Sequence, residues 1–269
     1  MDTLNAAERF RALHRPGAPL VMPNPWDAGS ARVLAALGFA ALATTSSGFA
    51  ATLGRADGSV TREEALEHAG RIVAAVDVPV SADLEDGFAD DPAEVAATVD
   101  GAARVGLAGC SIEDYSRHRG ILDSGLAAER IAAAVRAGAG RLVLTARAEN
   151  FLHARPDLAD TIDRLQRFQR AGADVLYAPG LRRPEDIAAV VKSVDRPVNV
   201  LLLPDGPAIP ELAELGVSRV SIGGAFAYAA FGALAEAARE LQHGPSYTFW
   251  NRAADGRDLI RGVAATGRP

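Results

Sequence analysis

Cysteine and long apolar runs are scarce in this sequence, and each shortage excludes a class of protein. Cys110 is the only cysteine, so neither an internal disulfide nor a cysteine-based metal framework can form. No stretch reaches the ~18 uninterrupted apolar residues of a membrane span, and the opening MDTLNAAERF lacks the apolar core of a signal peptide. We therefore expect a cytoplasmic protein without a membrane partner.

Negative charge outweighs positive charge. The formal net charge is -6 and no basic stripe runs along the chain, which argues against nucleic acid as a partner. Lys192 is the only lysine, and it falls in IAAVVKSV, a helical pattern expected on the outside of the fold. Because Schiff-base enzymes need a lysine inside the site, that chemistry is not expected here.

Short β-like runs alternate with amphipathic helical segments along the 269 residues. We predict strands at Pro19–Met22, Ala40–Thr44, Val78–Ala82, Gly109–Ile112, Leu142–Ala146, Val175–Tyr177, Val198–Leu202 and Val220–Ile222. We predict helices at Ala28–Leu37, Arg62–Ala75, Pro92–Val105, Ala127–Arg136, Asp157–Ala171, Pro184–Val194, Pro210–Leu215 and Ala225–Leu241. This alternation favours an α/β fold of the closed (β/α)8 TIM barrel type. An open doubly wound sheet would need a glycine-rich phosphate turn after its first strand, where NPWDAG stands instead.

Local signals support the helix assignments. Thr61 followed by Glu64 is typical of a capping box, and Asp91 before Pro92 is typical of an N-cap with proline in the first helical position. The phrases ALGFA, RVGLAG, RAGAD and ELGVS each end a helix with glycine and enter the next strand. We therefore predict a repeated βα unit.

The last residues exceed what a barrel needs. We predict one catalytic barrel domain over residues 1–244 and a C-terminal extension over 245–269. Tyr247, Phe249 and Trp250 form an aromatic cluster in this extension, and an exposed cluster of that kind is a liability for a monomer. We expect the extension to dock on a neighbouring subunit, with a frayed tail as the alternative.

Carboxylates follow two consecutive predicted strands. Asp83 and Glu85 follow one strand and Glu113 the next, so the barrel would bring them into one small volume. Like charges that close repel strongly unless a cation intervenes, and hard oxygen ligands select Mg²⁺ or Mn²⁺. We interpret Asp83 as a direct ligand, with Glu85 and Glu113 acting through bound water. The alternative is that these carboxylates cap the following helices.

Other polar residues stand at neighbouring strand ends. Arg147 could neutralise the excess carboxylates or present its planar fork to a substrate carboxylate. The run Thr45-Ser46-Ser47-Gly48 offers hydroxyls and backbone N–H groups to an anionic oxygen, or is an ordinary turn. Trp26 and Asn199 also end strands, and we count them as candidate substrate-binding residues.

Four segments in the same order resemble the isocitrate lyase/phosphoenolpyruvate mutase superfamily, between Phe10 and Gly244. They are PNPWDAGSARVLAALGFAALATTSSGFAATLG, the metal-binding phrase SADLEDGF, the segment GCSIEDY and the arginine phrase LTARAENF. The resemblance implies a barrel with Mg²⁺ beneath the oxygens of a pyruvate-like unit, where a C–C or P–C bond is made or broken next to an enolate.

The resemblance also implies residue roles. Asp83 would carry the metal with Glu85 and Glu113 in support, and Asp57 in LGRADG matches an aspartate close to the metal. Thr45, Ser46 and Ser47 would hold the carboxylate end of the ligand, and Arg147 would bond the same ligand. Family members are commonly tetramers that exchange their last barrel helix, which implies a swapped C-terminal helix and a homo-oligomer, dimer or tetramer.

The sequence departs from both archetypes of this superfamily. Isocitrate and methylisocitrate lyases carry a catalytic cysteine in a Lys-x-Cys-Gly-His phrase, whereas the corresponding loop here, YSRHRGILD, has none. Phosphoenolpyruvate mutases place lysine and asparagine in that loop and tryptophan near the second strand end; the nearest residues here are Arg119, Ile121 and Ala43. We expect neither activity, and we expect Cys110 to be a core residue.

The leading hypothesis is a Mg²⁺-dependent lyase that cleaves or decarboxylates a small 2-oxo or 2-hydroxy dicarboxylate, for example oxaloacetate, through an enolate. One alternative is a P–C bond enzyme in which Arg119 partly replaces the lysine, and another is a 2-oxo acid binding protein without turnover. The segment from Tyr115 to Leu126 is interpreted as a lid that brings Arg119 or His118 over the substrate, or else as a surface loop. We expect His14, His68 and His243 on the surface.

Overall fold

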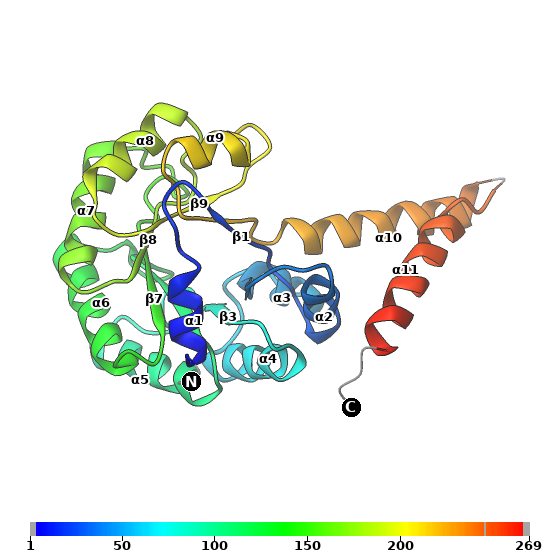
Figure 1. The fold of residues 1–269 in the computed structure, drawn as a ribbon, viewed down its shortest axis with the longest axis horizontal. Coiled ribbons are helices and arrows are strands. Elements are labelled where there is room, and N and C mark those ends of the chain that lie inside the picture. Colours follow the sequence, from blue (N-terminus) through cyan, green and yellow to red (C-terminus); the bar gives the residue numbers. More distant parts are fainter. Residues whose placement is uncertain (1–3, 245, 266–269) are drawn as a thin grey trace.

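The computed structural model describes residues 4–244 and 246–265, and these form a barrel with a projecting C-terminal arm (Figure 1). Within residues 4–244, eight parallel strands form one sheet in the order β1-β10-β9-β8-β7-β4-β3-β2. The strands are β1 (Leu20–Met22), β2 (Leu42–Ala43), β3 (Val80–Asp83), β4 (Gly109–Glu113), β7 (Val143–Arg147), β8 (Val175–Tyr177), β9 (Val198–Leu201) and β10 (Arg219–Ser221). Each overlaps a predicted strand.

Hydrogen bonds beyond the regular ladder connect the two ends of this sheet. The Ala43 amide donates to the Pro23 carbonyl at 3.1 Å, and Asn24 Nδ2 donates to the Thr44 carbonyl at 3.0 Å. These contacts bring β1 beside β2, so the sheet is nearly closed. The predicted (β/α)8 barrel is confirmed.

Helices surround the strands as the hydrophobic periodicity predicts. The predicted segments become α2 (Ala28–Ala36), α4 (Arg62–Ala75), α5 (Pro92–Arg104), α6 (Ser124–Gly138), α7 (Leu158–Arg170), α8 (Pro184–Ser193), α9 (Ile209–Glu214) and α10 (Ala225–His243). The Thr61 capping box forms, since its side chain accepts from the Glu64 amide while Glu64 accepts from the Thr61 amide at 2.9 Å. Asp91 likewise caps α5. Caps of this kind contribute about 1 kcal/mol each.

The structure adds elements that we did not predict. They are α1 (Ala6–Ala12), α3 (Ser46–Thr52), α11 (Phe249–Ala265) and the hairpin of β5 (Tyr115–Ser116) with β6 (Gly120–Ile121). Helix α1 begins with a capping box between Asn5 and Glu8. Its Phe10 is buried in an apolar cluster with Met22 and Val143, and so closes one end of the barrel. Helices α1 and α3 and both hairpin strands are short, so local patterns give little signal for them, whereas α11 lies in the extension, for which no secondary structure was predicted.

The main core lies between the strands and the helices around them. Cys110 is fully buried in it, and burial raises the pKa of its thiol to about 12, so the prediction that it is a core residue is confirmed. Lys192 is exposed on α8, outside the barrel, so it cannot form a Schiff base with a ligand inside the barrel. No helix in the described ranges is both long and apolar enough to traverse a bilayer.

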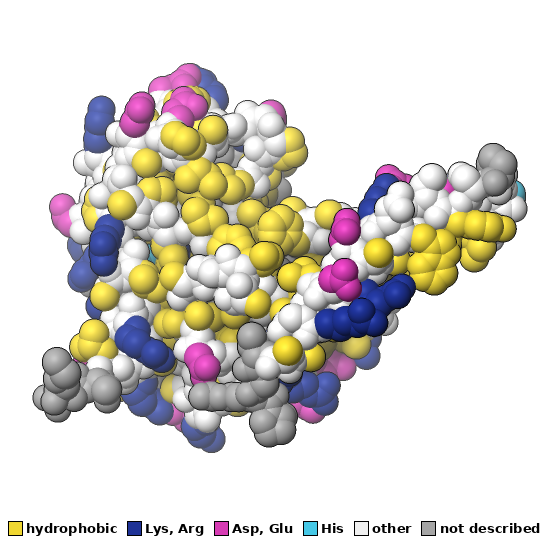
Figure 2. Space-filling view, turned by 45° about the vertical axis from the view of Figure 1, so that its right-hand side comes forward, with side chains coloured by type: hydrophobic (Ala, Val, Ile, Leu, Met, Phe, Trp, Pro, Cys, Tyr) yellow, Lys and Arg dark blue, Asp and Glu magenta, His cyan; other side chains and the backbone are white. Residues whose placement is uncertain are grey.

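Helix α10 leaves the barrel, and α11 folds back beside it toward α2 (Figure 1). Ala227 is the one buried residue of α10, and none of the described residues of α11 is buried. Figure 2 shows apolar side chains gathered on this arm; the exposed ones on α10 are Phe226, Tyr228, Phe231, Leu234 and Leu241. Of the predicted extension, residues 245 and 266–269 lie outside the described residues, as do residues 1–3 at the start of the predicted barrel domain.

Candidate active site

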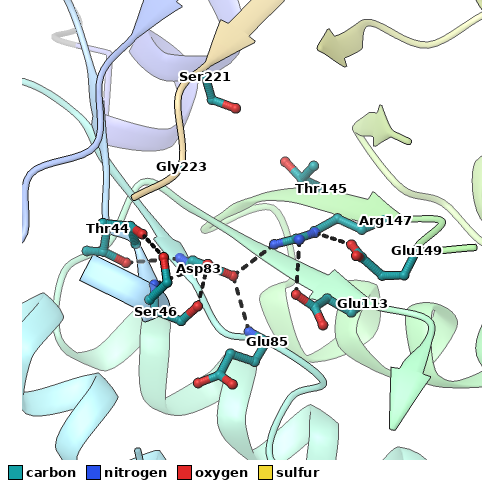
Figure 3. A network of polar contacts seen from close by, with 12 residues as sticks. Thr44, Ser46, Asp83, Glu85, Glu113, Thr145, Arg147, Glu149, Ser221 and Gly223 are labelled. Atoms are coloured by element: carbon teal, nitrogen blue, oxygen red, sulfur yellow. Dashed lines mark hydrogen bonds and ion pairs between the residues drawn. The ribbon is translucent and has the colours of Figure 1, made fainter. Parts of the chain in front are cut away.

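Asp83, at the end of β3, is the centre of a polar network at the mouth of the barrel (Figure 3). Its Oδ2 accepts hydrogen bonds from the Ser46 hydroxyl at 3.0 Å and the Ser46 amide at 3.2 Å. Its own amide donates to Thr44 Oγ1 at 3.0 Å. Its Oδ1 accepts from Arg147 Nη1, also at 3.0 Å. Bonds from the ends of β2 and β7 therefore fix Asp83 in place.

Arg147, at the end of β7, bonds three carboxylates of the protein. Strands β4 and β7 pair so that Glu113 stands opposite Arg147, and Arg147 Nη2 lies 3.1 Å from Glu113 Oε1. The Nε atom donates to Glu149 Oε1 at 2.6 Å, and Nη1 donates to Asp83. Burial alone would lower the pKa of Arg147, but these carboxylates hold it well above its usual value. The guanidinium therefore neutralises part of the acidic cluster.

The carboxyl groups of Glu85 and Glu113 resist ionisation. Burial raises the pKa of Glu85 to about 7, with a further rise from Asp83 and an opposing effect from Arg117. Burial also raises the pKa of Glu113 well above its ordinary value; Arg147 opposes this rise, and Glu149 and Asp83 add to it. Crowded carboxylates with raised pKa values are the setting in which a bound cation lowers the free energy most.

The donor set fits a hard cation without forming a closed cage. In the described part of the chain, no three His, Cys, Asp or Glu side chains are grouped closely enough to enclose a metal ion. Mg²⁺ does not require such a cage, because it commonly takes one or two protein carboxylates and keeps several waters. Asp83, with Glu85 and Glu113 nearby, meets that requirement.

A cavity of about 390 Å³ opens over this network. The predicted site residues that line it are Thr45, Ser46, Ser47, Asp57, Asp83, Glu113, Arg147 and Asn199. An adjoining cavity of about 470 Å³ shares several of these residues and is also lined by Glu85, Arg117 and Glu149. The hydroxyl run does not form a simple turn: Thr45 is the N-cap of α3, and its Oγ1 lies 3.1 Å from Ser47 Oγ.

Two predicted site residues lie elsewhere. Trp26 lines an apolar groove with Val33, Phe226 and Ile260, because the chain turns outward at Asp27 to begin α2. Arg119 is exposed in the turn between β5 and β6 and lines neither cavity.

The position over the carboxylates is taken instead by Arg117. Its guanidinium donates to Glu85 Oε2 at 2.5 Å. Both Arg117 and Arg119 belong to the same hairpin turn. The conformation of that turn decides which of them faces the site, and no local sequence pattern specifies it.

The sequence analysis also missed polar residues of the cavity. Glu149 stands two residues after Arg147 in ARAEN, and that proximity was a usable signal. Tyr177, Ser221 and Arg219 line the cavity from β8 and β10. Tyr177 and Ser221 lie within short predicted strands and Arg219 directly precedes one, but no local pattern shows that these side chains face the cavity.

Two of the three histidines expected on the surface are buried, so that expectation was wrong for them. His68 is 8% exposed, bonds the Trp26 carbonyl through Nε2 at 2.9 Å and stacks on Phe49. His14 is 9% exposed, and its Nδ1 bonds the Phe10 carbonyl at 2.9 Å. Both occupy positions that face the barrel. His243 is exposed as expected.

Similarity to known proteins agrees with this geometry. Residues 10–242 match the phosphoenolpyruvate phosphomutase family. An uncharacterized protein of Mycobacterium tuberculosis (strain ATCC 25618 / H37Rv) is 36% identical over 236 residues, which cover 87% of this chain and 89% of that protein. An oxaloacetate decarboxylase of Pseudomonas savastanoi pv. phaseolicola (strain 1448A / Race 6) is 31% identical over 237 residues, covering 81% and 78%.

A solved structure from Burkholderia cenocepacia J2315, provisionally described as a lyase/mutase, is similar over nearly the whole chain. It has a TM-score of 0.91 and 50% identity, and the match covers 96% of both chains. The resemblance recognised in the four sequence segments is confirmed. The chain belongs to the phosphoenolpyruvate phosphomutase family, within the isocitrate lyase/phosphoenolpyruvate mutase superfamily.

Proposed function

We propose that the protein is a Mg²⁺-dependent lyase that cleaves or decarboxylates a small 2-oxo or 2-hydroxy dicarboxylate, such as oxaloacetate, through an enolate. The observation that carries this proposal is the cluster of Asp83, Glu85 and Glu113 at the cavity, where burial and mutual repulsion raise the pKa values of both glutamates. The similarity to an oxaloacetate decarboxylase supports the substrate class.

Asp83 would bind the cation directly, and Glu85 and Glu113 would bind it through water. Mg²⁺, or Mn²⁺ with similar ligand preferences, would supply Lewis-acid withdrawal of charge from the substrate oxygens.

The chain's own side chains would supply the remaining interactions. Glu149 and Glu113 hold the Arg147 guanidinium rigidly beside the cavity, so its positive charge needs no reorganisation during the reaction. Thr45 and Ser47 would donate to the carboxylate end of the ligand from the start of α3. Asp57 lines both cavities and would order water next to the cation. Leu152, which also lines both cavities, restricts water at their mouth.

Two other functions make different demands on the site. P–C bond chemistry on a phosphonopyruvate-like substrate would call for a cation from the hairpin, but Arg119 is exposed and Arg117 bonds Glu85. A 2-oxo acid binding protein would have the same cavity without turnover. The geometry favours the lyase over the first alternative, and an activity measurement separates it from the second.

The test is pyruvate release from oxaloacetate, with the protein-free rate subtracted. We expect release with Mg²⁺ and none with EDTA. Asp83→Asn should lower the rate on the order of 100-fold, the loss typical when one preorganised electrostatic group is removed. Asp205→Asn, at an exposed surface ion pair with Arg182, is the matched control and should leave the rate unchanged.

Other outcomes would replace this proposal. Oxaloacetate binding without release would identify a binding protein. Phosphate release from phosphonopyruvate, with no pyruvate release from oxaloacetate, would identify a P–C bond enzyme.

We also propose that α10 and the extension 245–269 dock on a second copy of the chain, giving a dimer or tetramer with a swapped C-terminal helix. The support is that α10 leaves its own barrel with large apolar side chains exposed, among them Phe231 and Leu234. A long helix that buries only Ala227 is unfavourable in an isolated chain, and a symmetric neighbour is the simplest partner for it.

A further inference from the structure

We propose that Arg219, acting through Asn199 and Ser221, creates an anion subsite on the β8–β10 side of the cavity that receives the second carboxylate of the substrate. This inference rests on the proposed function, since it assumes a ligand whose first carboxylate and 2-oxo group lie at the Asp83 side. It assigns a positioning role to an arginine remote from the candidate metal ligands.

Arg219 is a buried cation whose side-chain partners are all neutral. It is 3% exposed on β10. Its Nε donates to Asn199 Oδ1 at 2.9 Å and its Nη2 to Thr145 Oγ1 at 3.0 Å, while Nη1 lies 3.2 Å from His14 Nε2. Within the described residues, no carboxylate forms an ion pair with Arg219. Arg147, by contrast, bonds three carboxylates.

The charge of Arg219 is retained at neutral pH. Burial, and then the nearby Arg147, lower its pKa to about 10, with a partial offset from Tyr177. His14 remains neutral beside it, because burial and the charge of Arg219 lower the imidazole pKa to about 3. A buried charge without a counter-charge is costly. An anion bound in the cavity would supply the counter-charge that the protein itself does not.

Arg219 also fixes the direction of the hydrogen bonds that lead to the cavity. An arginine can only donate, so Asn199 must use its Oδ1 to accept from it. Asn199 then donates through Nδ2 to Ser221 Oγ, at 3.1 Å. Because this bond occupies Ser221 as an acceptor, its hydroxyl proton is free to be donated.

The Tyr177 side chain belongs to the same group, since it lines the same cavity as Ser221, and Ser221 acts to lower the Tyr177 pKa. Burial raises the pKa of Tyr177 to about 12, so this hydroxyl keeps its proton at neutral pH. A hydrogen bond between the two hydroxyls, in either direction, would still leave one hydroxyl proton of the pair over. Both residues line the cavity, and that proton is therefore available to an acceptor oxygen of a ligand.

The two sides of the cavity differ in charge. The acidic residues of its lining, Asp57, Asp83 and Glu113, all lie on the β2–β4 side. The β8–β10 side presents Asn199, Ser221 and Tyr177 in front of Arg219, with Leu201 to Leu203 and Ile222 around them. Apolar neighbours exclude water and lower the local dielectric constant, which strengthens the attraction between a carboxylate and the buried cation. The cavity is thus matched to a ligand with a cation-bound end and a second anionic end.

The experiment compares two ligands in the presence of Mg²⁺ by calorimetry. Pyruvate has one carboxylate, and 3,3-difluorooxaloacetate has a second one. Asn199→Asp keeps a hydrogen-bond acceptor for Arg219 and gives this arginine a counter-charge. The new carboxylate can only accept, so Ser221 would donate its proton to it and no longer to a ligand in the cavity. We expect this variant to bind the dicarboxylate at least about tenfold more weakly, because one hydrogen bond to a charged group is lost. Its affinity for pyruvate should change less than about twofold.

A double-mutant cycle tests the proposed direction of donation. Ser221→Ala alone should weaken dicarboxylate binding. In the Asn199→Asp background, the same substitution should cause no further loss of dicarboxylate affinity. Additive losses would overturn the relay. Ser111→Ala, on the carboxylate side of the same cavity, is the matched control and should not change the ratio of the two affinities.

Arg219→Gln is a second variant that removes the charge and retains a donor. It should lose the preference for the dicarboxylate, and circular dichroism checks its fold; if it does not fold, the Asn199 and Ser221 cycle decides alone. Wild-type protein that binds neither ligand with Mg²⁺ would contradict the proposed function. Wild-type protein that binds both ligands equally would overturn only the subsite.

Discussion

The guanidinium of Arg117 donates a 2.5 Å hydrogen bond to Glu85, joining the β5–β6 hairpin to the loop after β3. Glu85 is buried there with a positive φ of 49°, a backbone conformation that non-glycine residues seldom adopt. The segment from Tyr115 to Leu126, which the sequence analysis interprets as a lid, thus has a direct contact with a candidate metal-binding carboxylate.

Arg117→Gln should weaken Mg²⁺ binding at neutral pH. Arg117 holds the pKa of Glu85 down to about 7 against burial and Asp83, so its loss should raise that pKa and leave Glu85 more protonated. A rise of about one pKa unit would lower the ionised fraction of Glu85 at pH 7 about fivefold. We therefore expect about a fivefold loss of Mg²⁺ affinity at pH 7 and a smaller loss at pH 9, both measured by calorimetry. Arg119→Gln, in the same turn but exposed, should leave the affinity unchanged. Equal losses in the two variants would show that the hairpin acts through its general charge.

His14 should make the fold sensitive to acid. Its pKa is lowered to about 3 in the folded chain, first by burial and then by Arg219, while an unfolded histidine has its ordinary value near 6.5. Between about pH 6.5 and pH 3 the unfolded state therefore binds a proton that the folded state does not. The free energy of unfolding should fall as pH falls through this window, with a contribution of at most ~1.4 kcal/mol per pH unit from this residue.

His14→Gln provides the comparison for that prediction. Glutamine can donate to the Phe10 carbonyl and accept from Arg219, yet it does not titrate. Urea denaturation at pH 7, 6, 5 and 4 should give a shallower decline for the variant than for wild type. Parallel declines would mean that other groups, and not His14, account for acid sensitivity.

Helix α10 should control the oligomeric state. Phe231 and Leu234 are 41% and 65% exposed, and charging them should prevent burial against a second copy. We expect wild-type protein to sediment as a dimer or tetramer in analytical ultracentrifugation, and Phe231→Arg combined with Leu234→Arg to sediment as a monomer. Arg239→Gln, exposed on the same helix, should retain the wild-type state. A monomeric wild type would contradict the docking proposal.

Local signals in the sequence were sufficient to predict the barrel. Hydrophobic periodicity, caps such as Thr61 and Asp91, and glycines at helix ends act over a few residues, so all eight strands and the helices between them could be located. The gathering of Asp83, Glu113 and Arg147 followed from the same information, because parallel strands in a barrel end at one edge.

The side chains that complete the cavity could be identified only in the folded chain. Arg219 meets His14 from 205 residues away, and Asn199 and Thr145 from 20 and 74 residues away, so no local pattern records their contact. The choice of Arg117 over Arg119 and the burial of His68 likewise depend on which face of an element packs inward. Charge and hydrogen-bonding capacity are properties of a residue type, but their use depends on burial and on partners that the folded chain alone supplies.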